Sequence, residues 1–142
     1  VLLLVKINVL ISETPCISCC VHTLNLIATK DANTPLQADG SYRKIYRTSF
    51  AKIQKFWNLL SRSTVAADNV KEVCNCTFPV PNATRWNSTY DAVKKLLTFK
   101  DKLGQVFQKL DLASLKIQEW NFLQEFCKLF ETLAISIDNL QV

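Results

Sequence analysis

The sequence of 142 residues has little glycine, one histidine and no methionine. Its two glycines, Gly40 and Gly104, stand far apart in the chain. Loops that cradle phosphates with backbone N–H groups need clustered glycines, so the common nucleotide-binding loops are excluded. Methionine is missing even at position 1, from which we expect an internal fragment of a longer chain or a truncated gene.

The sequence also has no hydrophobic run long enough to cross a bilayer. Its most apolar stretch, VLLLVKINVLIS at residues 1–12, is shorter than the roughly 20 residues of a transmembrane helix. Lys6 interrupts the run and no clear small-residue cleavage site follows, which argues against a signal peptide. We interpret the run as a buried strand and expect no membrane partner.

Acidic residues are absent from residues 41–67, although the whole chain carries a net charge of only +5. A single-sign stretch favours a polyanionic partner. Its alternative is a solvated helix face with counter-charges elsewhere, which we favour when the charge pattern is taken alone. The basic residues of this stretch are Arg43, Lys44, Arg47, Lys52, Lys55 and Arg62.

Apolar residues recur every three or four positions over most of the chain, which predicts a mainly α protein. Helices are expected over 16–31, 42–60, 64–73, 88–110 and 117–140, the fourth capped by Ser88 with Asp91 and loosened near Gly104. Prolines and small polar residues predict loops at 32–41 and 74–84. Short connections such as 111–116 favour an antiparallel bundle. The fourth helix is expected to bury Tyr90, Val93, Leu97, Leu103, Val106 and Leu110, and the last Trp120, Leu123, Phe126, Phe130, Leu133, Ile137 and Leu140.

Six cysteines leave two interpretations open besides reduced core thiols. Three Asn-x-Thr sequons would suit a disulfide-bonded secreted protein, but several of the cysteines are adjacent or nearly so, which makes them poor partners. Zinc would need four ligands, and neither half of the cluster has a familiar spacing. We favour a core cysteine and a hydrogen-bonded histidine, commit to no metal site, and keep zinc as a hypothesis. The cluster consists of Cys16, Cys19, His22, Cys74 and Cys76.

No catalytic constellation is evident. Cys19 or Cys20 would stand two or three residues from His22 on one helix, where the side chains do not face each other for proton transfer. A two-metal nuclease needs converging carboxylates, whereas the acids here are spaced mostly along helix surfaces. We therefore predict no small-molecule substrate.

Two segments together resemble a known family. They are CCVHTLNLIATKDA at residues 19–32 and PNATRWNSTYDAVKKLL at residues 81–97. A Cys-x-x-His leading into an apolar helix, followed several tens of residues later by Thr-Arg-Trp-Asn-Ser-Thr, is similar to the hAT (hobo–Activator type) DNA transposase superfamily. The resemblance extends over roughly residues 16–142 and is closest to the family's zinc-finger-associated animal branch.

This resemblance implies a fold and a division of the chain. The family has an RNase H-like α/β domain interrupted by a large helical insertion. Residues 1–41 would be the edge of a truncated RNase H-like domain, a strand plus the Cys-x-x-His helix. Residues 42–142 would be part of the helical insertion domain, a helical bundle.

The resemblance also implies that the family's chemistry is missing here. Its members use three carboxylates and two divalent ions, Mg or Mn, for strand cleavage and transfer. Residues 1–15 offer only Glu13 where the second Asp is expected, and Glu119, Glu125 and Glu131 lie on the insertion helix. We expect no catalytic residue, no cofactor and no enzyme activity in this chain.

Candidate DNA contacts follow from the same resemblance. Cys19 and His22 match a motif near the transposon-end DNA, and Trp86 matches a tryptophan that stacks on a flipped base beside Arg85. A buried core ring is the equally favoured interpretation of Trp86. The resemblance also favours a phosphate-facing surface on the basic helix that begins at residue 42, formed by Arg43, Lys44, Arg47, Lys52 and Lys55.

We thus expect an inactive, degenerate or domesticated piece of a nuclear hAT transposase with residual, weak DNA contact. The alternative is a transposase-derived helical module that binds protein through its aromatic faces. A homo-oligomer is left open.

Overall fold

The structure is a computed structural model that describes residues 40–82 and 86–141, without the side chains of residues 86, 140 and 141. The predicted strand at 1–12, the Cys-x-x-His helix, Cys19, His22 and Arg85 lie outside the described residues. Within them the protein is helical and contains no strand. The helices are α4 (Gly40–Arg62), α5 (Thr64–Cys74), α6 (Trp86–Thr98), α7 (Lys100–Lys109) and α8 (Ile117–Gln141).

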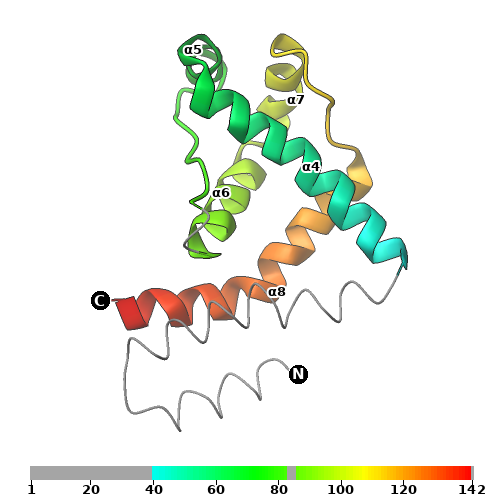
Figure 1. The fold of residues 1–142 in the computed structure, drawn as a ribbon, viewed down its shortest axis with the longest axis vertical. Coiled ribbons are helices and arrows are strands. Elements are labelled where there is room, and N and C mark those ends of the chain that lie inside the picture. The colour runs from blue at the N-terminus through cyan, green and yellow to red at the C-terminus, as the bar shows by residue number, and fades with distance from the viewer. Residues whose placement is uncertain (1–39, 83–85, 142) are drawn as a thin grey trace, which may run out of the picture.

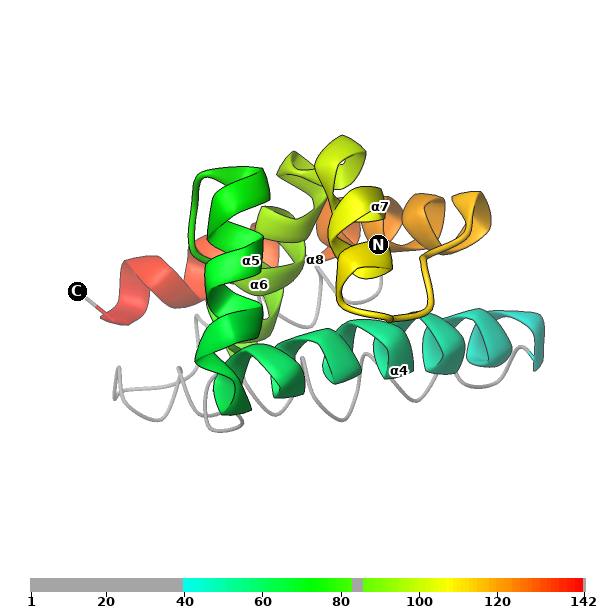
Figure 2. The same ribbon diagram turned by 90° about the horizontal axis from the view of Figure 1, so that it is seen from above.

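Figure 1 shows α4 crossing α8, with α6 beside α8. Helices α5 and α7 pack against each other toward the C-terminal end of α4. Seen from above, α4 runs along one edge of the described helices (Figure 2). The predicted antiparallel packing holds for α6 and α8, since Asn87 contacts Asp138 while Lys94 contacts Glu131. It does not hold for α4, which crosses α8 at Phe122 instead.

Helix α4 was predicted from its apolar spacing, and the structure confirms a one-faced helix. Ile53 and Trp57 are fully buried, while most of the other expected positions pack at the edge of the core. Phe56 is also fully buried, which the spacing did not predict. The helix begins at Gly40, two residues before the expected start, so the loop predicted for 32–41 ends earlier.

A single residue, Ser63, separates α4 from α5. Its backbone is extended, and its hydroxyl oxygen accepts a hydrogen bond from the N–H of Ala66, as a helix N-cap does. At the other end Asn75 adopts a left-handed conformation with φ 54°, and its N–H donates to the carbonyl of Lys71. Asparagine tolerates this conformation well, and the chain turns here out of α5.

The structure has two helices where one was predicted over 88–110. The predicted cap at Ser88 and the predicted weak point near Gly104 were both wrong. Helix α6 begins at Trp86, so Ser88 lies inside its first turn, and that turn contains no acid. The hydroxyl of Ser88 instead exchanges hydrogen bonds with the backbone of Asn82. The break falls at Phe99 and not near Gly104, which lies within α7. Phe99 packs its ring against Phe78 at 5.6 Å, and this contact holds the corner.

The core is one aromatic-rich cluster to which all five helices contribute. Helix α8 supplies the largest share, and the described positions that its spacing predicted are buried, with Phe122, Cys127 and Ala134 in addition. Glu119 is buried as well, at 5% exposure, although the acids were expected to lie mostly along helix surfaces. None of the described helices has the length and apolar character needed to cross a membrane.

Candidate nucleic-acid interface

The outward face of α4 carries most of the basic residues predicted to contact DNA. Successive residues on a helix turn by 100°, so Lys44, Lys55 and Arg62, spaced by 11 and 7 positions, share one line along the axis. Arg43 and Arg47 form a second line beside it. All five residues are exposed, and α4 contains no acid. We call this surface the α4 basic face.

The α4 basic face is long enough to follow a nucleic-acid backbone. From Arg43 to Arg62 it extends for about 28 Å at 1.5 Å per residue. Double-stranded DNA carries one phosphate per ~1.7 Å of its axis, so the face spans many more phosphates than it has cations. Its contact would depend on charge and not on base sequence.

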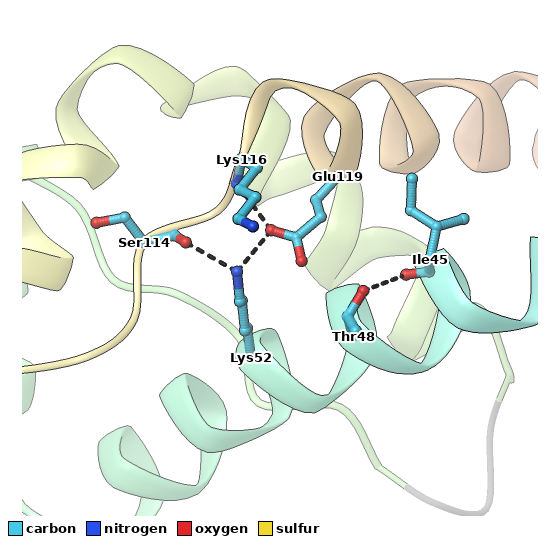
Figure 3. A network of polar contacts seen from close by, with 6 residues as sticks. All are labelled: Ile45, Thr48, Lys52, Ser114, Lys116 and Glu119. Carbon is cyan, nitrogen blue, oxygen red and sulfur yellow. Dashed lines mark hydrogen bonds and ion pairs between the residues drawn. The ribbon is translucent and has the colours of Figure 1, made fainter. Parts of the chain in front are cut away.

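Lys52 is placed differently from the other predicted contacts of α4. Figure 3 shows its side chain directed from α4 toward the turn that precedes α8. There its Nζ donates to the carbonyl of Ser114 at 3.0 Å and to the carboxylate of Glu119 at 2.7 Å. Its side chain is 21% exposed. The geometry gives Lys52 a structural partner, whereas the α4 basic face turns toward solvent.

Glu119 joins α4 to the start of α8. Besides Lys52, its Oε2 accepts the backbone N–H of Lys116 at 2.7 Å, which satisfies one of the free donors at the helix start. Burial alone raises the pKa of Glu119, but the hydrogen bonds from Lys52 and the Lys116 N–H, with the charge of Lys52, bring this pKa below its ordinary value. The carboxylate is therefore ionised near neutral pH.

At the Thr-Arg-Trp-Asn motif the structure describes only part of the expected site. Helix α6 begins at Trp86, but the side chain of Trp86 and all of Arg85 lie outside the described residues. Whether the indole stacks on a base or fills the core therefore stays a prediction.

The next residue of the motif, Asn87, is buried and ties α6 to α8. Its Nδ2 donates to Asp138 Oδ1 at 2.5 Å and to the carbonyl of Ala134 at 3.4 Å. Its own Oδ1 is buried without a hydrogen-bond partner. The pKa of the nearby Asp91 is raised by partial burial and by the charge of Asp138, against the opposing effect of Lys94. This contact has no signal in the local sequence, because Asp138 lies 51 residues away.

The cysteine–histidine cluster is described only in its second half. Cys74 is buried and Cys76 half-buried, and both thiols are free. Among residues 40–82 and 86–141, no three metal-ligating side chains of the His, Cys, Asp or Glu type come together. The zinc hypothesis depends on Cys16, Cys19 and His22, so it stays a hypothesis.

Comparison with known proteins adds no relative: no family model, no curated protein and no solved structure matches this chain. The likeness to hAT transposases therefore depends on the Cys-x-x-His and Thr-Arg-Trp-Asn-Ser-Thr motifs, and the α4 basic face is the structural feature that suggests a function.

Proposed function

We propose that this chain is a non-catalytic helical module of hAT-transposase type that contacts nucleic acid in the nucleus through the α4 basic face. One observation carries the proposal: five exposed cations lie along one side of a 23-residue helix that has no acid of its own. Neutralising phosphates with such cations supplies most of non-specific DNA affinity.

The position of Glu119 supports the non-catalytic part of the proposal. Its Oε2 accepts both the ammonium group of Lys52 and the Lys116 N–H, so this carboxylate already has a structural role within the fold. Parent-family strand cleavage would need Mg or Mn held by a carboxylate set. We expect no such carboxylate set in this chain. Metal-dependent nicking of plasmid DNA that is abolished by mutating an acid of this chain would contradict the proposal.

The experiment is a salt titration of duplex DNA affinity with two charge-matched triple variants. The first, Arg47→Gln/Lys55→Gln/Arg62→Gln, removes three charges from the α4 basic face. The second removes three exposed charges from other helices: Lys71→Gln/Lys102→Gln/Lys128→Gln.

The first variant should bind duplex DNA more weakly, with a slope of log K against log salt shallower by about 2–3, since each phosphate contact contributes ~0.9. The second should stay close to the unmodified protein. Equal effects of the two variants would show that net charge alone, and not the α4 basic face, governs binding.

A protein-binding module is the second candidate, and the exposure of Leu129 and Ile135 on α8 favours it. Its earlier form, binding through aromatic faces, has less support, because the rings of Phe122, Phe126 and Phe130 are buried in the core. Association with a partner, or with a second copy, that is insensitive to salt would favour this candidate over DNA contact.

A further inference from the structure

A groove lies between the first half of α4 and the start of α8, on the flank next to the α4 basic face. Its volume is about 790 Å³, within the ~300–1,000 Å³ typical of small-molecule sites. Lys44 belongs both to this groove and to the α4 basic face. A ligand bound along the α4 basic face could therefore extend into the groove while it still contacts that face.

The charge of the groove suits an anion. Three lysines, Lys44, Lys52 and Lys116, line it with one acid, Glu119. The Oε2 of that acid accepts hydrogen bonds from Lys52 and the Lys116 N–H, as Figure 3 shows, so Lys52 offsets its charge and Lys44 and Lys116 leave the groove with a positive balance. The groove also opens at the N-terminal end of the 25-residue helix α8, which is the positive end of its dipole.

The same groove has an apolar wall. Tyr42 and Ile45, both half-buried, line it from α4. The ring of Tyr42 is fixed edge-on against Phe122, with centroids 5.2 Å apart. A phosphate alone would leave this wall uncovered, whereas an anion that carries a flat ring would cover it. A nucleotide combines these two properties.

We propose that the α4–α8 groove holds one nucleotide of a single strand, its phosphate near Lys44 and Lys116 and its base against Tyr42 and Ile45. A base within a duplex is stacked and paired and cannot reach such a wall, which selects a single strand. The inference rests on the proposed function, because the strand reaches the groove along the α4 basic face.

The test uses Gln118→Glu, which places a negative charge in the groove. A glutamate in the first turn of α8 is favourable for the helix, so a loss of binding would not come from a weakened fold. The matched control is Gln124→Glu, an exposed position on the same helix that does not line the groove. A second pair, Lys116→Gln against Lys128→Gln, removes one charge inside and one outside the groove.

Affinities are measured by fluorescence anisotropy with a labelled oligothymidylate and with a duplex of the same length. Gln118→Glu should weaken single-strand binding about tenfold, the loss expected for one stacked base, and leave duplex binding nearly unchanged. Lys116→Gln should act in the same direction, and both controls should bind as the unmodified protein does.

Three results would overturn the inference. Equal single-strand affinity of Gln118→Glu and Gln124→Glu would show an empty groove, and the proposed function would survive if the α4 triple variant still weakened binding. If the α4 triple variant also leaves the DNA affinity unchanged, both the groove inference and the proposed function are wrong. Displacement of the oligothymidylate by millimolar thymidine monophosphate, itself sensitive to Gln118→Glu, would assign the groove to a free nucleotide instead of a strand.

Discussion

At the scale of single residues, the Glu119 carboxylate holds a buried charge in place. Replacing it by glutamine would leave the ammonium group of Lys52 without its counter-ion. Breaking a buried pair costs about 3–5 kcal/mol, and the partial exposure of Lys52 reduces this to about 2–3 kcal/mol. Chemical denaturation of Glu119→Gln should show this loss in the free energy of unfolding. Glu125→Gln, at an exposed position of the same helix, should change it by less than about 0.5 kcal/mol.

The stabilising effect of Glu119 should depend on pH with a definite sign. Because folding lowers the pKa of this group, its contribution is present above the unfolded value and is lost as pH falls through the folded one. The difference in unfolding free energy between the unmodified protein and Glu119→Gln should thus shrink below about pH 4.5. A difference that stays constant down to strongly acidic pH would contradict the pairing with Lys52.

Cys127 provides a prediction of reactivity. Burial, reinforced by Glu131 against the opposing charge of Lys94, raises the pKa of the Cys127 thiol to about 11. Since the thiolate is the reactive form, Cys127 should label with iodoacetamide far more slowly than the half-buried Cys76 at neutral pH. Peptide mass spectrometry after timed labelling measures both rates. Similar rates in the folded protein, and not only in denaturant, would show that Cys127 is accessible.

At the scale of the elements, α7 contains a residue that weakens it. Gly104 is a helical glycine with no positive φ, and a Cβ built on it would meet no atom within 4 Å. Gly104→Ala should therefore raise the free energy of unfolding by about 1 kcal/mol, chiefly through the entropy of the unfolded chain. Gly40→Ala, at the first residue of α4, is the control and should change the free energy of unfolding by only a few tenths of a kcal/mol, because a residue at a helix end is less constrained than one in its interior. A loss of stability in Gly104→Ala would mean that the glycine is needed for packing.

The elements also show what sequence patterns can and cannot predict. Helices α4, α5 and α8 were predicted nearly to their ends, because apolar spacing reports the buried face directly. The break at Phe99 had a signal, since the step of six from Leu97 to Leu103 fits no helical face. It was missed because glycine was taken as the weak point, whereas the ring of Phe78 holds the corner from a loop.

The candidate site was predictable only where it depends on local sequence. The α4 basic face follows from residues of one helix, so its charges were identified in advance. The roles of Lys52 and Asn87 were not, because their partners lie 67 and 51 residues away and periodicity carries no information on such pairs. The groove likewise requires Lys116, which lines the same groove as Lys44 only because α4 and α8 cross.

At the scale of the whole molecule, Phe122 is the α8 ring that contacts the most aromatic residues of α4. Tyr42, Tyr46 and Phe50 all contact its ring, with centroid distances of 5.2, 6.1 and 6.4 Å. Phe122→Ala should lower the free energy of unfolding by about 3–5 kcal/mol. Thermal or denaturant unfolding measures the loss, with the exposed Leu129→Ala as the control on the same helix. An effect no larger than that of the control would show that the crossing is not held at this ring.

The position of this crossing has a consequence for synthesis on the ribosome. Phe122 is made about 80 residues after Tyr42, which takes roughly 4–16 s at ordinary elongation rates. Throughout that interval the aromatic side of α4 has no partner from α8 to cover it. The aromatic rings of α4 thus lack their α8 partner until Phe122 has been synthesised, and during this interval the nascent polypeptide should be a substrate for chaperones that shield apolar surfaces.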